Sequence, residues 1–83
     1  MMPMLKIYGS MMCPDCVQCR EDLDRAGVAY EYLDFSDALL NLKEFLHLRE
    51  GDAFTQVRAN GSIGIPCIVT DDGQIHFDWH KFL

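Results

Sequence analysis

The sequence lacks any apolar run that approaches the roughly 18 residues needed for a membrane-spanning helix. Its first residues, Met1–Met4, lack the basic segment and the long apolar stretch of a secretory signal peptide. Internal repeats, low-complexity tracts and linkers are absent as well. These absences predict a single domain over residues 1–83 that is located in the cytoplasm and does not associate with membranes.

Positive charge is scarce, because 7 Lys and Arg residues stand against 13 Asp and Glu residues and give a formal net charge of −6. Nucleic-acid binding depends on basic patches, so the sequence argues against a nucleic-acid partner. The 4 cysteines are fewer than a secreted disulfide scaffold of this length usually carries. In a cytosolic chain, closely spaced cysteines are more often catalytic or metal-binding, and the choice between these two uses decides the function.

The first third of the chain predicts a strand, a helix and a second strand. Residues 4–8 are mostly apolar, aromatic or β-branched, as in a strand. Pro14 suits the first position of a helix and Gly27 suits its end, so the apolar spacing between them predicts a helix over 14–26. Val28–Phe35 carries apolar residues on both faces, which is typical of a strand covered on both sides.

The middle of the chain predicts two helices. Residues that recur at intervals of three and four indicate an amphipathic helix, with Ser36 as its N-cap and an end near Gly51. The periodic positions are Leu39, Leu42, Phe45, Leu46 and Arg49. Asp52 is expected to cap a shorter helix that runs through Ala59.

The last third of the chain predicts a β-hairpin. Strands over 65–70 and 74–77 are joined by a turn at Asp71-Asp72-Gly73, and 78–83 is long enough for at most about a turn and a half of helix. The earlier strands alternate with helices and should therefore be parallel, with right-handed crossovers. The predicted fold class is α/β, with a mixed four-stranded sheet and helices on both of its faces.

The segment Cys13-Pro14-Asp15-Cys16 lies between the first predicted strand and the first predicted helix. A cysteine at a helix N-terminus faces the positive end of the helix dipole and free backbone N–H groups, and both favour the thiolate. The thiolate is the nucleophile in disulfide exchange. The second cysteine follows about one helical turn later, so one thiol can attack a disulfide and the other can resolve the mixed disulfide.

Two stretches place this cysteine pair in a wider pattern. They are residues 7–16 (Ile-Tyr-Gly-Ser-Met-Met-Cys-Pro-Asp-Cys) and residues 64–69 (Gly-Ile-Pro-Cys-Ile-Val). In this arrangement the chain resembles the glutaredoxin family of thioredoxin-fold proteins over nearly its whole length. The resemblance implies a thioredoxin-like fold of the glutaredoxin type, with a C-terminal helix shortened to Asp78–Leu83. It implies the activity of a thiol–disulfide oxidoreductase.

By this resemblance, Cys13 is the exposed nucleophile and Cys16 is the buried resolving thiol. Pro66 is then a cis-proline packed against the cysteine pair, whereas without the resemblance it reads as an ordinary trans proline that opens a strand. Ile65 offers backbone groups to a bound peptide or to glutathione. The residues implied in substrate binding are Met12, Pro14, Asp15, Ile65 and Pro66.

Three features differ from the usual glutaredoxin pattern. Ser10 stands where a lysine usually precedes the nucleophile, Gly64 stands where a threonine usually precedes the cis-proline, and the glycine pair after the last strand is absent. These residues usually help to hold glutathione, so the sequence favours a protein reductant or a narrow protein substrate. No cofactor is expected to be permanently bound.

The expected partners follow from the activity. The substrate is a disulfide-containing protein or a small-thiol compound, and the electron donor is a flavoprotein reductase or glutathione acting as co-substrate. The protein is expected to work as a monomer.

The two remaining cysteines leave alternatives open. Cys19 extends the spacing and reads either as a small buried helix residue or, with Cys67 as a fourth thiolate, as a ligand of zinc or an iron–sulfur cluster. Thiols at every third helix position do not converge on one ion, so no metal site is expected. Cys67 reads as a buried strand thiol or as an auxiliary redox thiol. The alternative functions are a cysteine-based metal-binding module and a redox-sensing adaptor.

Overall fold

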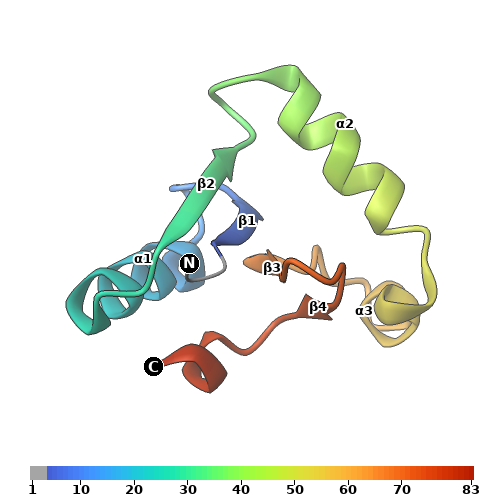
Figure 1. Cartoon of the computed structure of the whole chain (residues 1–83). Helices are drawn as coiled ribbons and strands as arrows, with labels where there is room; N and C mark the ends of the chain where they lie inside the picture. The colour runs from blue at the N-terminus through green and yellow to red at the C-terminus, as the bar shows by residue number, and fades with distance from the viewer. Residues whose placement is uncertain (1–3) are drawn as a thin grey trace.

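A mixed four-stranded sheet with the strand order β2-β1-β3-β4 forms the centre of the molecule (Figure 1). The computed structural model describes residues 4–83. The prediction that no signal peptide is present concerns Met1–Met4, most of which lies outside the described residues. β1 (Leu5–Gly9) pairs in parallel with β2 (Tyr30–Asp34) and antiparallel with β3 (Cys67–Val69). β3 also pairs antiparallel with β4 (Ile75–His76). The predicted α/β class and mixed sheet are confirmed.

Helices lie on both faces of this sheet (Figure 1). α1 (Pro14–Ala26) and the 3₁₀ helix η2 (Trp79–Phe82) cover one face. The other face is covered by α2 (Leu39–Leu48), the 3₁₀ helix η1 (Asp52–Phe54) and α3 (Thr55–Ala59). The predicted bounds of the first helix are confirmed, because proline at its start and glycine after its end are strong local signals.

The second strand is shorter than its apolar run predicted. It spans the five residues Tyr30–Asp34, because the residues directly after α1 form the end of that helix and do not pair with β1. Gly27 adopts a left-handed φ of 73°, and the Val28 N–H donates to the Leu23 carbonyl at 3.0 Å. Val28 therefore belongs to the end of the helix, and regular pairing with β1 begins at Tyr30.

The prediction that Ser36 caps the second long helix is wrong. Its hydroxyl donates to Asp34 Oδ1 at 2.6 Å, so it forms a turn with the preceding strand and caps nothing. The N-cap is Ala38, without a side-chain hydrogen bond, and the helix ends at Leu48 rather than near Gly51. A serine hydroxyl can either cap a helix that follows it or form a hydrogen bond within a local turn, and Ser36 forms the turn with Asp34.

The short helical region after α2 has the predicted extent, but Asp52 is not its cap. Gly51 occupies the N-cap position of η1, and Asp52 is the first residue of that helix. The Arg58 guanidinium donates to the carbonyls of Arg49 and Gly51 at 2.6 and 2.8 Å. Arg58 thus satisfies the Arg49 carbonyl at the C-cap of α2, and it adds a second hydrogen bond to the Gly51 carbonyl, which also accepts from the Phe54 N–H at 3.1 Å.

The core consists of two clusters, one on each face of the sheet. The buried residues on the α1 face are Leu5, Ile7, Cys19, Leu23 and Ile68. Those on the α2 face are Tyr8, Phe45, Phe54 and Cys67. Consecutive strand residues point to opposite faces, so Ile7 and Tyr8 contribute to different clusters, as do Cys67 and Ile68.

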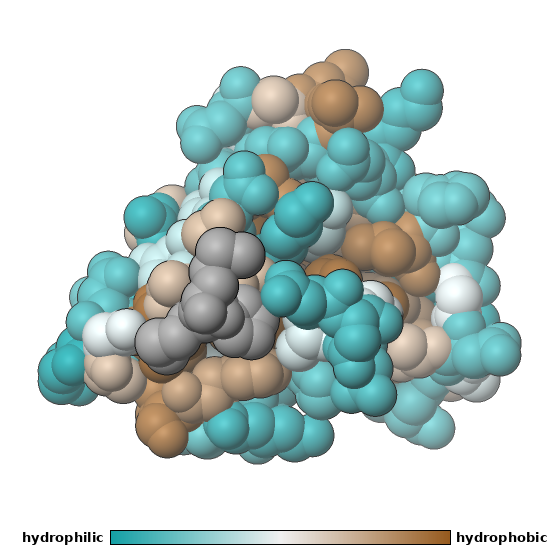
Figure 2. Space-filling model, in the orientation of Figure 1, coloured by the Kyte–Doolittle hydropathy of each residue, from teal (hydrophilic) through white to brown (hydrophobic). Residues whose placement is uncertain are grey.

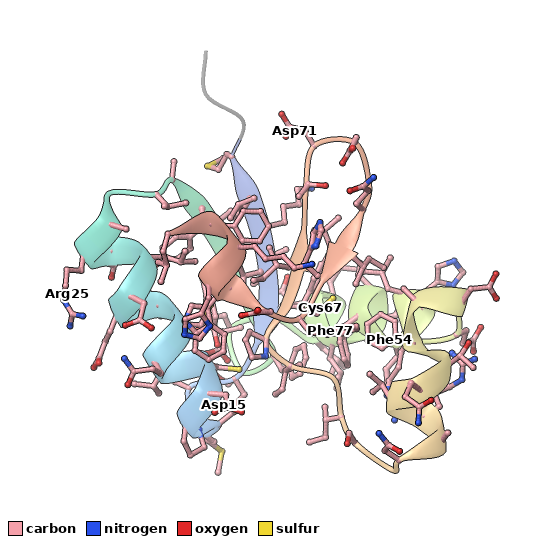
Figure 3. All side chains as sticks on the ribbon, turned by 90° about the horizontal axis from the view of Figure 1, so that it is seen from below. Asp15, Arg25, Phe54, Cys67, Asp71 and Phe77 are labelled. Atoms are coloured by element: carbon pink, nitrogen blue, oxygen red, sulfur yellow. The ribbon has the colours of Figure 1, made fainter. Side chains whose placement is uncertain are left out.

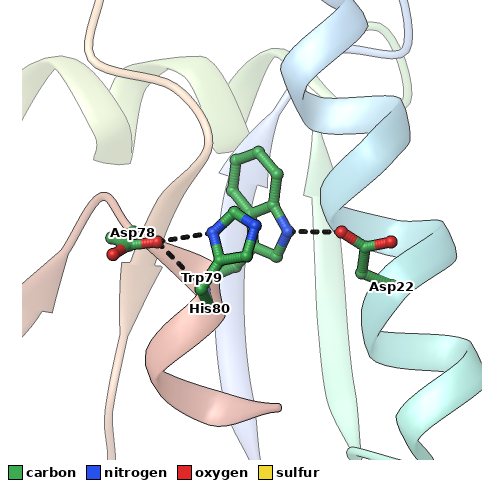
Figure 4. Close-up of polar contacts among 4 residues, drawn as sticks. All are labelled: Asp22, Asp78, Trp79 and His80. Atoms are coloured by element: carbon green, nitrogen blue, oxygen red, sulfur yellow. Dashed lines mark hydrogen bonds and ion pairs between the residues drawn. The ribbon is translucent and has the colours of Figure 1, made fainter.

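The C-terminal segment covers the α1 face through Trp79 and Phe82. Trp79 Nε1 donates to Asp22 Oδ2 at 2.8 Å, which ties η2 to α1 (Figure 4). Asp78 caps η2 by accepting from the His80 backbone N–H at 3.0 Å. One turn of helix therefore takes the place of a longer terminal helix on this face.

The α2 helix is less amphipathic in the structure than in the sequence. Within its predicted apolar stripe only Phe45 is fully buried, whereas Leu39 and Leu46 are exposed, as is Leu40. Figure 2 shows apolar side chains on the surface at the top of the molecule, where Figure 1 places α2. Within residues 4–83, no helix has both the length and the apolar character that crossing a membrane demands.

Candidate functional site

Cys13 and Cys16 lie at the junction between β1 and α1. Cys13 is the N-cap residue with extended backbone angles (φ −94°, ψ 119°), and Pro14 is the first helical residue. The Cys13 N–H donates to the Ser10 carbonyl at 3.0 Å, and the Cys13 carbonyl accepts from Val17 N–H at 3.1 Å. Cys13 is half-buried, whereas Cys16 is fully buried. One thiol is thus accessible to a substrate and the other lies beneath it.

The surface around Cys13 includes three of the residues predicted to bind substrate. Met12 is 93% exposed, and Pro14 and Asp15 are exposed as well. Figure 3 places Asp15 at the end of α1 that is farthest from Arg25, which marks the cysteine end of the helix. A protruding methionine beside an accessible thiol offers a flexible apolar contact to a partner.

Ile65 and Pro66 approach the same edge of the sheet. The peptide bond between them is cis, as predicted. Pro66 is buried, and Ile65 is half-buried. In the antiparallel register Tyr8 pairs with Cys67, so Pro66 comes next to Gly9, the residue from which the chain leaves toward the cysteines. The loop that leads to Cys13 and the bond between Ile65 and Pro66 therefore both lie at the C-terminal end of β1.

Asp34 holds the loop before the cysteines, and the sequence reading missed it. Asp34 is 5% exposed, and its carboxylate accepts from the Met11 N–H at 3.3 Å and from the Ser36 N–H at 2.8 Å. The hydrogen bonds from Ser36 and Met11 lower the pKa of Asp34. The two-residue spacing from Asp34 to Ser36 is a sequence signal for the turn. No local sequence signal indicates the contact with Met11, because Met11 lies 23 positions away.

The surroundings of Cys16 disfavour its thiolate form. Burial raises its pKa to about 11, and the neighbouring Cys13 thiol adds to the rise. The Ser10 backbone and the Tyr32 hydroxyl act in the opposite direction, because hydrogen bonds from them to a Cys16 thiolate lower that pKa. Cys16 therefore carries a proton at neutral pH unless an event at the site removes it.

The other two cysteines do not join this pair at one point. Cys19 packs on the α1 face, whereas Cys67 lies on the α2 face among Phe54 and Phe77 (Figure 3). Burial raises the pKa of each thiol to about 12. Among the residues from 4 to 83, no group of three His, Cys, Asp or Glu side chains is placed to hold a metal ion. Four thiolates converging on one ion would require a different fold.

Alkylation should distinguish Cys13 from the other three thiols. At pH 8 a thiol with a pKa of about 11 is thiolate in roughly one molecule in a thousand, and Cys16, Cys19 and Cys67 are also fully buried. Iodoacetamide should therefore add one group per folded chain and four after denaturation, as measured by mass spectrometry. Cys13→Ser should take up none, and Cys19→Ala should still take up one; a fast second addition would contradict the assignment.

The chain is 39% identical over 76 residues to an uncharacterized protein of Haemophilus influenzae. The alignment covers 90% of this chain and 88% of that protein. No protein-family model matches the chain, and no solved structure matches it. The comparison therefore identifies a relative that aligns over most of both chains, and it gives no activity for either protein.

Proposed function

The chain belongs to one family with this Haemophilus influenzae protein, and we propose, from the geometry of its own site, that it is a glutaredoxin-like thiol–disulfide oxidoreductase. One observation carries the proposal. Cys13 is accessible at the N-terminus of α1, and Cys16 is buried one turn further along the same helix. This is the arrangement that a nucleophilic thiol and a resolving thiol require.

The position of Cys13 suits attack on a disulfide. It is the N-cap residue, and the first turn of α1 leaves backbone N–H groups without helical acceptors. A sulfur anion at this position is stabilised by those groups and by the helix dipole. Asp34 fixes the preceding loop through Met11, so the thiol is held in place before the substrate arrives.

The reaction is a two-electron exchange. The Cys13 thiolate attacks one sulfur of the substrate disulfide, that S–S bond breaks, and the other sulfur leaves as a thiolate that takes a proton from water. Cys16 then loses its proton to solvent and attacks Cys13 Sγ, which releases the second substrate sulfur. The substrate is reduced to two thiols, and the dithiol is oxidised to a Cys13–Cys16 disulfide.

The proposed fold is thioredoxin-like in its short glutaredoxin form. The observations that support it are the parallel β1-α1-β2 unit, the antiparallel hairpin after it, and a buried Pro66 beside the end of β1. η2 replaces the usual terminal helix. The substrates would be disulfides of proteins or small thiols, reduced at the expense of glutathione or of a reductase.

A redox titration tests the proposed function. The purified protein is equilibrated in glutathione and in dithiothreitol buffers of stepped ratio, and free thiols are counted at each step. A reversible two-electron couple should appear in the wild type and vanish in Cys13→Ser. Cys19→Ala, which alters a thiol on the same helix, should retain the couple.

Two results would overturn the proposal. One is a wild-type protein whose thiols show no reversible couple. The other is a set of thiols that stay blocked until a chelator removes a metal, which would favour the metal-binding module. A couple that forms without turnover of a disulfide substrate would favour the redox-sensing adaptor instead.

A further inference from the structure

The hydroxyl of Tyr32 is buried without a hydrogen-bond partner among residues 4–83. Tyr32 lies on β2, the strand that pairs in parallel with β1, and Ile7 is its register partner. A buried hydroxyl without a partner costs stability, because it has lost its hydrogen bonds to water. Such a group calls for an explanation from its surroundings.

The polar group that faces this hydroxyl is the thiol of Cys16. A Cβ atom built on Gly9 would lie 2.8 Å from Cys16 Sγ and 2.8 Å from the Tyr32 hydroxyl oxygen. The two atoms are therefore at most twice that distance apart, and both border the space beside the Gly9 Cα atom. Gly9 leaves open the space through which they approach each other, and an alanine there would collide with both.

The ring of Tyr32 is held in this position from outside. The Arg20 guanidinium carbon lies 4.4 Å from the ring centroid, as in a cation–π contact, and Arg20 Nε donates to the Tyr30 hydroxyl at 3.4 Å. Burial raises the pKa of Tyr32, so the phenol keeps its proton throughout the physiological range. A phenol that stays protonated can act as a donor.

We propose that the Tyr32 hydroxyl is the hydrogen-bond donor that stabilises the Cys16 thiolate during the resolving step, and this role rests on the proposed oxidoreductase function. A neutral thiol is a weak acceptor, which explains why the hydroxyl has no partner in the reduced protein. A thiolate is a strong acceptor. The hydrogen bond therefore becomes strong when Cys16 becomes the attacking group, and an interaction that is stronger at that stage speeds the step.

The chemistry of the step is that of the proposed reaction. Cys16 releases its proton to solvent, its sulfur attacks Cys13 Sγ in the mixed disulfide, and the bond from Cys13 to the substrate sulfur breaks. The substrate sulfur leaves with the electron pair. Tyr32 keeps its proton and contributes the hydrogen bond alone. Titratable or charged groups lie around Cys16 and Tyr32 on α1 and β2, namely Cys13, Cys19, Arg20 and Asp34.

Stopped-flow reaction with dithiobis(nitrobenzoate) tests the role. Attack by Cys13 releases one coloured thiolate and leaves a mixed disulfide, and attack by Cys16 then releases a second. In Tyr32→Phe the second phase should slow about tenfold, which is the lower range for a hydrogen bond to a charged group. Its pH profile should move upward by about one unit, since a tenfold change corresponds to one pKa unit. The first phase should be unchanged.

The matched control is Tyr8→Phe, which removes a β1 hydroxyl that donates to Glu44 on the other face of the sheet. Both phases should keep their wild-type rates in that variant. A second phase of unchanged rate and pH profile in Tyr32→Phe would refute the donor role and leave the oxidoreductase function standing. Release of only one coloured thiolate per wild-type chain would refute the oxidoreductase function and the donor role with it. Thermal melting of both variants shows that the fold is retained.

Discussion

The reduced protein is expected to unfold steeply as the pH rises above about 9, the ordinary pKa of a thiol. Burial raises the pKa of Cys16 to about 11 and those of Cys19 and Cys67 to about 12. Between these values the unfolded chain has lost protons that the folded chain still holds. Stability is therefore complete below pH 9 and falls as the pH rises.

The expected effect is large. Each thiol in this window removes about 1.4 kcal/mol per pH unit, so three together remove about 4 kcal/mol per pH unit. The total stability of a domain of this length is about 4–12 kcal/mol, so one to three pH units are enough to unfold it. Tyr8, whose pKa burial raises to about 12, adds to the loss above pH 10.

Urea unfolding at stepped pH measures this slope. Cys19→Ala removes one of the three buried thiols, so its free energy of unfolding should fall about one third less per pH unit. Oxidation of the pair should have a similar effect, because a disulfide sulfur does not titrate. A slope that is the same in wild type and Cys19→Ala would show that the buried thiols do not govern alkaline unfolding.

Gly64→Ala is expected to destabilise the protein by about 2–5 kcal/mol. Gly64 has a φ of +93°, which an alanine adopts only at a cost of about 1–2 kcal/mol. Its new methyl group would also lie 2.8 Å from Phe54 Cε2 and 3.0 Å from Val57 Cγ1. Phe54 is fully buried beside Phe45, so its ring cannot move aside freely.

Gly61→Ala is the matched control for this substitution. Gly61 has a similar φ of +71°, and no atom lies within 4 Å of the position that a Cβ would take. Thermal or urea unfolding of the two variants therefore separates the backbone penalty from the collision. Equal losses of stability in both would mean that the Phe54 ring yields without cost.

Gly64 also illustrates what a family pattern leaves out. Gly64 stands where glutaredoxins usually have a threonine, and the sequence alone predicts that this difference removes a contact to glutathione. In the structure, the left-handed backbone and the nearby Phe54 ring leave room for no larger residue. The change in residue type thus has a packing reason in this chain.

Local signals predicted those parts of the fold that local interactions determine. Pro14 and Gly27 fixed α1, and Gly73, with a φ of 82°, fixed the hairpin. Ser36 failed as a helix cap because the carboxylate of Asp34, two residues before it, takes its hydroxyl. The cis bond before Pro66 was anticipated only from the resemblance, since an X–Pro bond is cis in about 5–6% of cases.

The sequence could not reveal the residues that support the cysteines from a distance. Asp34 reaches Met11 across 23 positions, and Tyr32 reaches Cys16 from a neighbouring element. Neither residue belongs to a motif, and each would be read as an ordinary strand position. Their roles arise from the parallel pairing of β1 with β2, which sets Tyr32 beside Ile7 and Asp34 beside Gly9.

The pairing of β1 with β3 joins segments about sixty residues apart, a long loop to close. Ile68 on β3 packs in the same cluster as Cys19, so that cluster is incomplete until the last part of the chain has been synthesised. While the protein is being translated, the first three cysteines therefore leave the ribosome without their cover. In an oxidising milieu the nascent thiols would be open to premature cross-linking, so preparation of the protein should keep the chain reduced until folding is complete.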